Sequence, residues 1–234
     1  MNLLEDGVES MGGMIGSQHD LSEMVEEYGF LPFFRNAVPG FSVEEHTPYD
    51  LWFADGVDGP WEWKGPVIGE TGCAYGKFYA GKAMFISREW FCDFANYRRD
   101  GYDLDARYED GLLRRQDRDL WNVLAEHPSM ISREWRHAAG VARRGEFDAA
   151  VNRLQMMGYV TTTDFEYPMD KDGNLYGFGL ARYAAPENHF GKEFTDHVYE
   201  REPEESGRRM EEYLTNLLPQ ADEREIRRVI GKRR

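Results

Sequence analysis

Five arginines lie between residues 127 and 153, in a chain whose formal net charge is −15. That segment holds only three acidic residues. A guanidinium group donates hydrogen bonds to phosphate oxygens and to guanine edges, so such a cluster is typical of nucleic-acid contact. The alternative is a solvated helix face in a domain that packs against protein. We predict a nucleic-acid-binding set consisting of Arg133, Arg136, Arg143, Arg144 and Arg153.

The elements around these arginines follow a recognisable order. A helix with inward-facing leucines ends before Pro128, and a shorter helix ends at Gly140. A longer helix, from Glu146 to Met157, has an apolar face, and residues 161–183 are rich in β-branched and aromatic residues. The pair Asp172-Gly173 interrupts that last run, as the turn of a β-hairpin does.

This order predicts an α+β fold in which residues from about 116 to 183 form a winged helix-turn-helix. The third helix would enter the major groove of duplex DNA, and the hairpin 161–183 would flank it. Any other α+β domain with one hairpin is the structural alternative. We divide the chain into a flexible N-terminal arm (1–18), an aromatic-rich α+β subdomain (19–110), the winged helix (111–186) and a C-terminal helical extension (187–234).

The aromatic-rich subdomain owes its name to residues 49–108, which hold 15 of the 33 aromatic residues. We predict a strand over residues 59–70, a hairpin that pairs 75–79 with 82–86, and a helix that Ser87 caps. A second, divergent winged helix is the alternative for this half. Its aromatic residues either form core or line a pocket for a small ligand or a stacked base; the pocket candidates are Trp52, Trp61, Trp63 and Tyr75.

Charge and cysteine content limit the kinds of partner, the cellular location and the cofactors that we expect. Residues 1–60 contain twelve acids and the single base Arg35. This acidic region would suit a basic protein partner, or would fold over the arginines and mask them. With no run of 18 apolar residues and only Cys73 and Cys92, we expect no membrane span, no disulfide framework and a cytoplasmic location. We expect no metal and no cofactor, because no ligand spacing or phosphate loop occurs.

Three stretches of the chain together resemble a known family. These are SREWFCDFANYRRDGYDLDARYEDG, RLQMMGYV and DFEYPMDKDGNLYGFGLARY. They are similar to bacterial relatives of the AlkZ-type winged-helix DNA glycosylases, over roughly residues 30–205. The resemblance implies a tandem array of winged-helix motifs and a role in removing alkylated or crosslinked bases from DNA.

The chain departs from that family at the catalytic pair. The family's enzymes carry Gln-apolar-Gln or Gln-apolar-Asp, and none of Gln18, Gln116, Gln155 and Gln220 begins such a triplet. We therefore expect a DNA-binding protein without catalysis, or with a vestigial site. One alternative is an active glycosylase in which Asp164 or Glu166 positions a water molecule. Another is a module in which the aromatic residues bind a small ligand or a protein.

Overall fold

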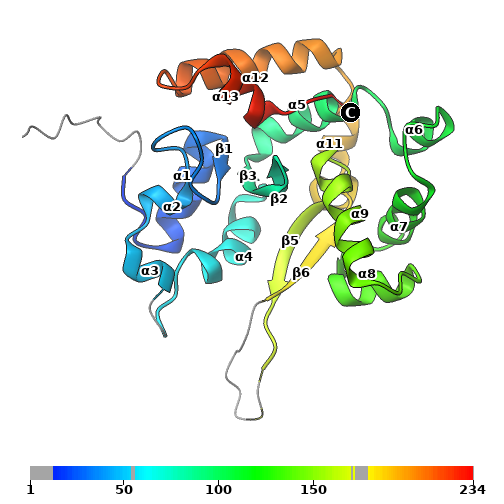
Figure 1. Ribbon diagram of the computed structural model, residues 1–234, viewed down its shortest axis with the longest axis horizontal. Coiled ribbons are helices and arrows are strands. Elements are labelled where there is room, and N and C mark those ends of the chain that lie inside the picture. The colour runs from blue at the N-terminus through cyan, green and yellow to red at the C-terminus, as the bar shows by residue number, and fades with distance from the viewer. Residues whose placement is uncertain (1–12, 54–55, 170, 172–178, 234) are drawn as a thin grey trace, which may run out of the picture.

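One antiparallel sheet runs through both halves of the chain (Figure 1). The computed structural model describes residues 13–53, 56–169, 171 and 179–233. Within them the strand order is β1-β3-β2-β5-β6-β4. The strands are β1 (Phe30–Pro32), β2 (Ala74–Tyr79), β3 (Lys82–Ile86), β4 (Met130–Ile131), β5 (Thr161–Glu166) and β6 (Leu180–Ala184). The predicted α+β class is confirmed.

Among the described residues, no helix is both long enough and apolar enough to cross a membrane.

Helices surround the sheet. The N-terminal half holds α1 (Gln18–Tyr28), α2 (Val43–His46), α3 (Tyr49–Phe53), α4 (Pro60–Thr71) and α5 (Arg88–Arg99). Next along the chain are α6 (Leu104–Glu109), α7 (Arg115–Ala125), α8 (Ser132–Ala138) and α9 (Arg144–Met156). The last helices are α10 (Pro186–Phe190), α11 (Lys192–His197), α12 (Pro203–Leu217) and α13 (Glu223–Ile230).

The two halves of the sheet meet where β2 pairs with β5. Tyr75 lies opposite Thr162 at this junction. The buried side chain of Gln155, on α9, accepts a hydrogen bond from the Lys77 backbone N–H at 3.2 Å and donates to Thr162 Oγ1 at 3.2 Å. A Cβ on Gly76 would stand 2.8 Å from Gln155 Nε2, so only glycine leaves room for this amide. The amide therefore joins α9 to strands of both halves.

Local sequence signals predicted several elements correctly. The first hairpin turns at Ala80 and Gly81, whose φ angles of 49° and 83° are the positive values that a tight turn needs. α5 begins directly after Ser87, as predicted, although the Ser87 side chain makes no capping hydrogen bond. The strands β5 and β6 form the second predicted hairpin, although its turn at Asp172-Gly173 lies outside the described residues.

The predicted strand over residues 59–70 is wrong, because this stretch forms α4. Pro60 occupies the first turn, where its missing N–H has no helical partner to lose. Glu62 accepts a hydrogen bond from the Gly59 N–H at 3.0 Å, and Gly72 ends the helix in a left-handed conformation. These helix-start and helix-stop signals outweigh the aromatic content, which had favoured a strand.

The C-terminal helices pack against the N-terminal half. α12 lies along α5, and α13 lies beside α12 and β2 (Figure 1). Asp222 and Glu225 form a reciprocal capping box at the start of α13. At its other end the fully buried Arg98 donates to the carbonyl oxygens of Ile230 and Val229. The last turn of α13 is thus satisfied by a side chain from α5.

The chain begins its described part in contact with the same half. Ile15 is fully buried, and its N–H donates to the His46 carbonyl at 2.7 Å. Residues 1–12 of the predicted arm lie outside the described residues. Most buried apolar side chains belong to one core beneath α1, α4, α5 and α12, and a smaller core fills the space between α7, α8 and α9.

Candidate functional site

The smaller core positions α9, which we predicted as the recognition helix. Trp135 of α8 is fully buried, and its indole N–H donates to the Leu120 carbonyl at 2.8 Å. Its ring meets Phe147 of α9 edge to face, with centroids 5.1 Å apart. Leu154 is buried on the same face of α9, two turns beyond Phe147. The exposed residues of α9 are confined to its first half, at Arg144, Gly145, Glu146, Asp148 and Ala149.

Arg143 and Arg144 stand at the exposed start of α9. Their side chains are 83% and 86% exposed, so phosphate oxygens can reach them. Arg143 lies 3.5 Å from Glu146, and Arg144 lies 3.6 Å from Asp148. Exposed pairs of this kind contribute no more than about 1 kcal/mol, so exchanging a carboxylate for a phosphate costs little. Arg133, on α8, is also exposed.

The other two arginines of the predicted set have partners within the fold. Arg136 donates to the carbonyls of Val141 and Ala142, at 3.2 and 3.0 Å, and so closes the turn between α8 and α9. Arg153 makes a bidentate pair with Asp117 of α7, at 2.8 and 2.6 Å. The Asp117 side chain is 2% exposed. These two residues hold the helices in place, which leaves three outward-facing arginines.

The carboxylates at the base of the second hairpin lie on its exposed surface. Asp164 Oδ1 accepts a hydrogen bond from the Phe165 N–H at 2.7 Å and lies beside Gly65 of α4. Glu166 forms an ion pair with Arg182 across the hairpin. The two acids therefore have local structural partners, and they come from one strand rather than converging from separate elements.

A buried lysine fastens this hairpin to α4. Lys64 is 6% exposed, and its ammonium lies 4.2 Å from the centroid of the Phe165 ring. It donates to the Trp61 carbonyl and, at 3.2 Å, to the Tyr167 hydroxyl. The Tyr167 hydroxyl in turn donates to the Trp61 carbonyl at 2.8 Å. Burial lowers the pKa of Lys64 to about 8. The hydrogen bonds and the aromatic ring thus offset part of the free-energy cost of removing the Lys64 ammonium from water.

Replacing Lys64 with methionine should change how stability depends on pH. The folded chain has the lowered lysine pKa of about 8, whereas the ordinary value is 10.5. Between these values the unfolded chain binds more protons, so the wild-type free energy of unfolding rises with pH. Relative to Lys64→Met, the wild type should gain up to about 3 kcal/mol from pH 8 to 10.5.

Urea denaturation of both proteins at pH 7.5 and pH 10.5 measures this difference. Burial raises the pKa of Tyr167 to about 12, so its hydroxyl keeps its proton across most of this window. Lys77→Met, at the exposed middle of β2, is the matched control and should follow the wild type. If wild type and Lys64→Met kept a constant stability difference across the window, Lys64 would not be buried as described.

The four aromatic pocket candidates are parts of the larger core. Trp52, Trp63 and Tyr75 are 8%, 9% and 6% exposed. Trp61 is half-buried, and its ring meets Trp52 edge to face with centroids 5.8 Å apart. Phe33 packs against Trp52, Trp61 and Tyr75 with centroids 5.2, 5.3 and 6.0 Å away. Trp52, Trp61 and Tyr75 therefore pack around Phe33, and Trp63 is buried in the same core.

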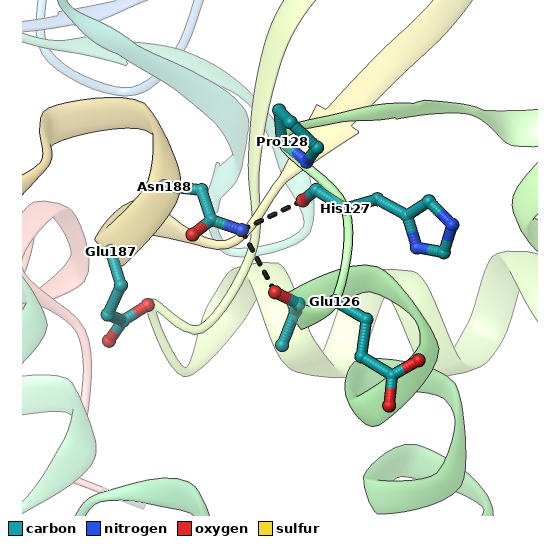
Figure 2. Close-up of a pocket in the computed structure, with 6 residues that line it drawn as sticks. Glu126, His127, Pro128, Glu187 and Asn188 are labelled. Carbon is teal, nitrogen blue, oxygen red and sulfur yellow. Dashed lines mark hydrogen bonds between the residues drawn. The ribbon is translucent and has the colours of Figure 1, made fainter.

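Two concave sites that the sequence did not indicate adjoin Glu187 of α10. An open cleft of about 450 Å³ lies between α10 and the loop after α7 (Figure 2). Asn188 donates across it to the carbonyls of Ala125 and His127, at 3.2 and 2.8 Å (Figure 2). Asn188 thus satisfies carbonyls at the end of α7 and ties α10 to it. A second cavity, of about 230 Å³, lies on the other side of Glu187, between α7 and α11.

A comparison with protein-family models matches residues 15–231 to the family described as AlkZ related. The chain belongs to the AlkZ-related family. The match spans both halves of the sheet and the C-terminal helices, and it confirms the resemblance drawn from the sequence. No curated protein and no solved structure matches the chain. Membership relates the protein to DNA-repair glycosylases.

The glutamines of this AlkZ-related chain form no pair. Gln155 has both amide atoms engaged within the sheet, as described above. Gln18 donates to Glu70 at 3.1 Å, and Gln220 donates to the Pro39 carbonyl at 3.0 Å. Gln116 is exposed at the start of α7. The four therefore lie on different elements, three of them in contacts with their own surroundings.

Proposed function

We propose that this AlkZ-related protein binds double-stranded DNA through a winged helix and does not cleave the glycosidic bond. The winged helix would comprise α7, β4, α8 and α9, with the β5–β6 hairpin as its wing. The observation that carries the proposal is the setting of α9. One face of it is fixed in the smaller core, while Arg143 and Arg144 extend from its first turn into solvent.

Three further features support the DNA-binding part of this proposal. β4 pairs with β6 and thereby ties the three helices to the hairpin, the arrangement that places a wing beside a recognition helix. Arg133 at the start of α8 adds a third exposed cation in the same helix-turn-helix segment. The family relation is to proteins of DNA repair. The acids Glu146 and Asp148 oppose phosphate binding and should keep the affinity modest.

Replacing both Arg143 and Arg144 with alanine should weaken duplex binding by about tenfold or more. Each lost phosphate contact should reduce the slope of log affinity against log salt by about 0.9, so the slope should flatten by about 2. Fluorescence anisotropy with a labelled duplex across a salt series measures both quantities. The pair Glu146→Gln and Asp148→Asn is the matched control, because it removes negative charge from the same turn and should raise affinity.

The results separate this proposal from its alternatives. If the Arg143→Ala, Arg144→Ala variant kept the wild-type slope of log affinity against log salt, the start of α9 would not contact DNA. Incubation with an alkylated duplex, beside a known glycosylase as positive control, tests the non-catalytic part. Base release by the wild type that Asp164→Asn or Glu166→Gln abolishes would favour the enzyme alternative.

A further inference from the structure

Partly exposed apolar side chains extend from the loop after β1, across the start of α4, to the β5–β6 hairpin. We call them the α4–hairpin strip, which consists of Phe34, Trp61, Phe165, Tyr167 and Met169. The ring centroids of Phe34 and Trp61 are 5.8 Å apart. The Lys64 ammonium lies 5.3, 4.2 and 5.7 Å from the ring centroids of Trp61, Phe165 and Tyr167. The four rings therefore form one continuous group.

Solvent reaches every member of this strip. Met169 is 67% exposed, and the four rings are only partly buried. Packing on Phe33 covers the inner side of Phe34 and Trp61. Aromatic and methionine side chains are enriched at protein–protein interfaces, and an exposed group of apolar side chains marks a contact site. The outer side of the strip therefore suits a binding partner.

Two carboxylates flank the strip. Glu62 and Asp164 are exposed, and neither forms an ion pair with a residue that the structure describes. Burial, followed by the negative charges of Glu62 and Asp164, raises the pKa of Tyr167 to about 12. Both carboxylates are thus close enough to act on a ring of the strip.

The cations around the strip already have partners inside the chain. Lys64 is 6% exposed, so its ammonium is covered by the rings rather than offered to solvent. Arg182, which lies across the hairpin, pairs with Glu166. Arg35, which follows Phe34 in the chain, lies 3.9 Å from Glu45. The border of the strip is consequently negative, and it attracts cations and repels phosphate.

We propose that the α4–hairpin strip binds a segment of a partner protein in which arginine or lysine alternates with apolar residues. The apolar side chains pack on the strip, and the cations pair with Glu62 and Asp164 or stack on the rings. Duplex DNA does not fit, because its phosphates would meet the same carboxylates. Figure 1 shows α4 on one side of the β5–β6 hairpin and α8 on the other, so this binding does not depend on the DNA contact proposed above.

Fluorescence anisotropy of a labelled peptide with alternating arginine and leucine, titrated with the full chain, tests this proposal. A peptide of alternating arginine and serine should bind at least about fivefold more weakly, because it has the charge without the apolar side chains. A peptide of alternating glutamate and leucine should bind at least about tenfold more weakly. A dissociation constant above about 1 mM for the arginine–leucine peptide, or equal binding of the arginine–serine peptide, would overturn the proposal.

Two pairs of substitutions locate the peptide on the acidic chain. Glu62→Gln with Asp164→Asn removes both charges but keeps the oxygens that accept backbone hydrogen bonds, and it should weaken binding by about tenfold or more. Glu23→Gln with Glu26→Gln, at exposed positions of α1, is the matched control and should stay within about twofold of wild type. Equal losses in the two variants would mean general attraction to an acidic protein and would overturn the assignment.

Replacing Met169 with serine tests the apolar contact separately. Because this side chain is exposed, the variant should melt as the wild type does, and it should bind the arginine–leucine peptide at least about threefold more weakly. Unchanged affinity would show that the peptide does not lie on the hairpin end of the strip and would overturn the site.

Other occupants give different results. The Arg143→Ala, Arg144→Ala variant should bind the peptide as the wild type does, whatever its affinity for DNA; loss of peptide binding would place the peptide at α9 and overturn the proposal. Analytical ultracentrifugation should give the same mass for the wild type and for the Glu62→Gln, Asp164→Asn variant. A dimer that only the wild type forms would identify a second copy of the chain as the occupant and overturn a separate partner.

Discussion

Replacing Arg98 with methionine should lower the free energy of unfolding by about 3–5 kcal/mol, the largest loss that we expect from one substitution. Arg98 is 1% exposed and reaches from α5 to three other elements. Besides α13, its guanidinium donates to the carbonyls of Met156 and Phe78, each at 3.0 Å. Methionine fills a similar volume but leaves these buried carbonyl oxygens without donors, and each such loss costs about 1–3 kcal/mol.

Urea denaturation followed by circular dichroism measures this effect, and hydrogen exchange should show that the amides of α13 lose protection first. Arg98→Lys keeps the charge but not the planar fork, so its loss should be intermediate. Arg233→Ala is the surface control, because Arg233 is 40% exposed in its pairs with Asp100 and Glu204. A stability within about 1 kcal/mol of wild type for Arg98→Met would contradict the anchoring role.

Replacing Arg153 with alanine should cost about 2–4 kcal/mol, because Asp117 would stay buried without its partner. The Arg153 side chain is 26% exposed, which places the loss below that of a fully buried pair. A double-mutant cycle with Asp117→Ala should recover part of the loss, since the second change removes the stranded charge. Arg144→Ala, which breaks only an exposed pair, should change stability by less than about 1 kcal/mol. Additive losses in the cycle would show that the pair does not couple α7 to α9.

The same variant separates a structural arginine from one that contacts DNA. Measured below its melting temperature, Arg153→Ala should keep the wild-type salt slope of duplex binding, because Asp117 rather than phosphate occupies the guanidinium. The Arg143 and Arg144 double variant should flatten the slope. A slope that fell by about 0.9 in Arg153→Ala would return this residue to the predicted nucleic-acid-binding set.

Short-range signals in the sequence were sufficient for elements whose stabilising contacts are local. The Ala80-Gly81 turn, the helix after Ser87 and the apolar face of α9 depend on backbone conformation and on residues three to five positions apart. The error at α4 arose where aromatic composition and the capping signals of one segment disagreed. The motifs that suggested the family are contiguous stretches of sequence, so they could be found without the structure. The match over residues 15–231 confirmed the family.

Which arginines face solvent could not be read from composition, because each outcome depends on a partner far away in the chain. Asp117 precedes Arg153 by 36 residues, and Tyr167 follows Lys64 by 103. The Arg99–Glu187 pair spans 88 residues, so the cavity beside it has no sequence signature. In the folded chain Arg153 and Lys64 make contacts with other parts of the protein, whereas the side chains of Arg143 and Arg144 are exposed to solvent. Local patterns thus specified the elements, whereas tertiary packing decided which charges remain available for binding.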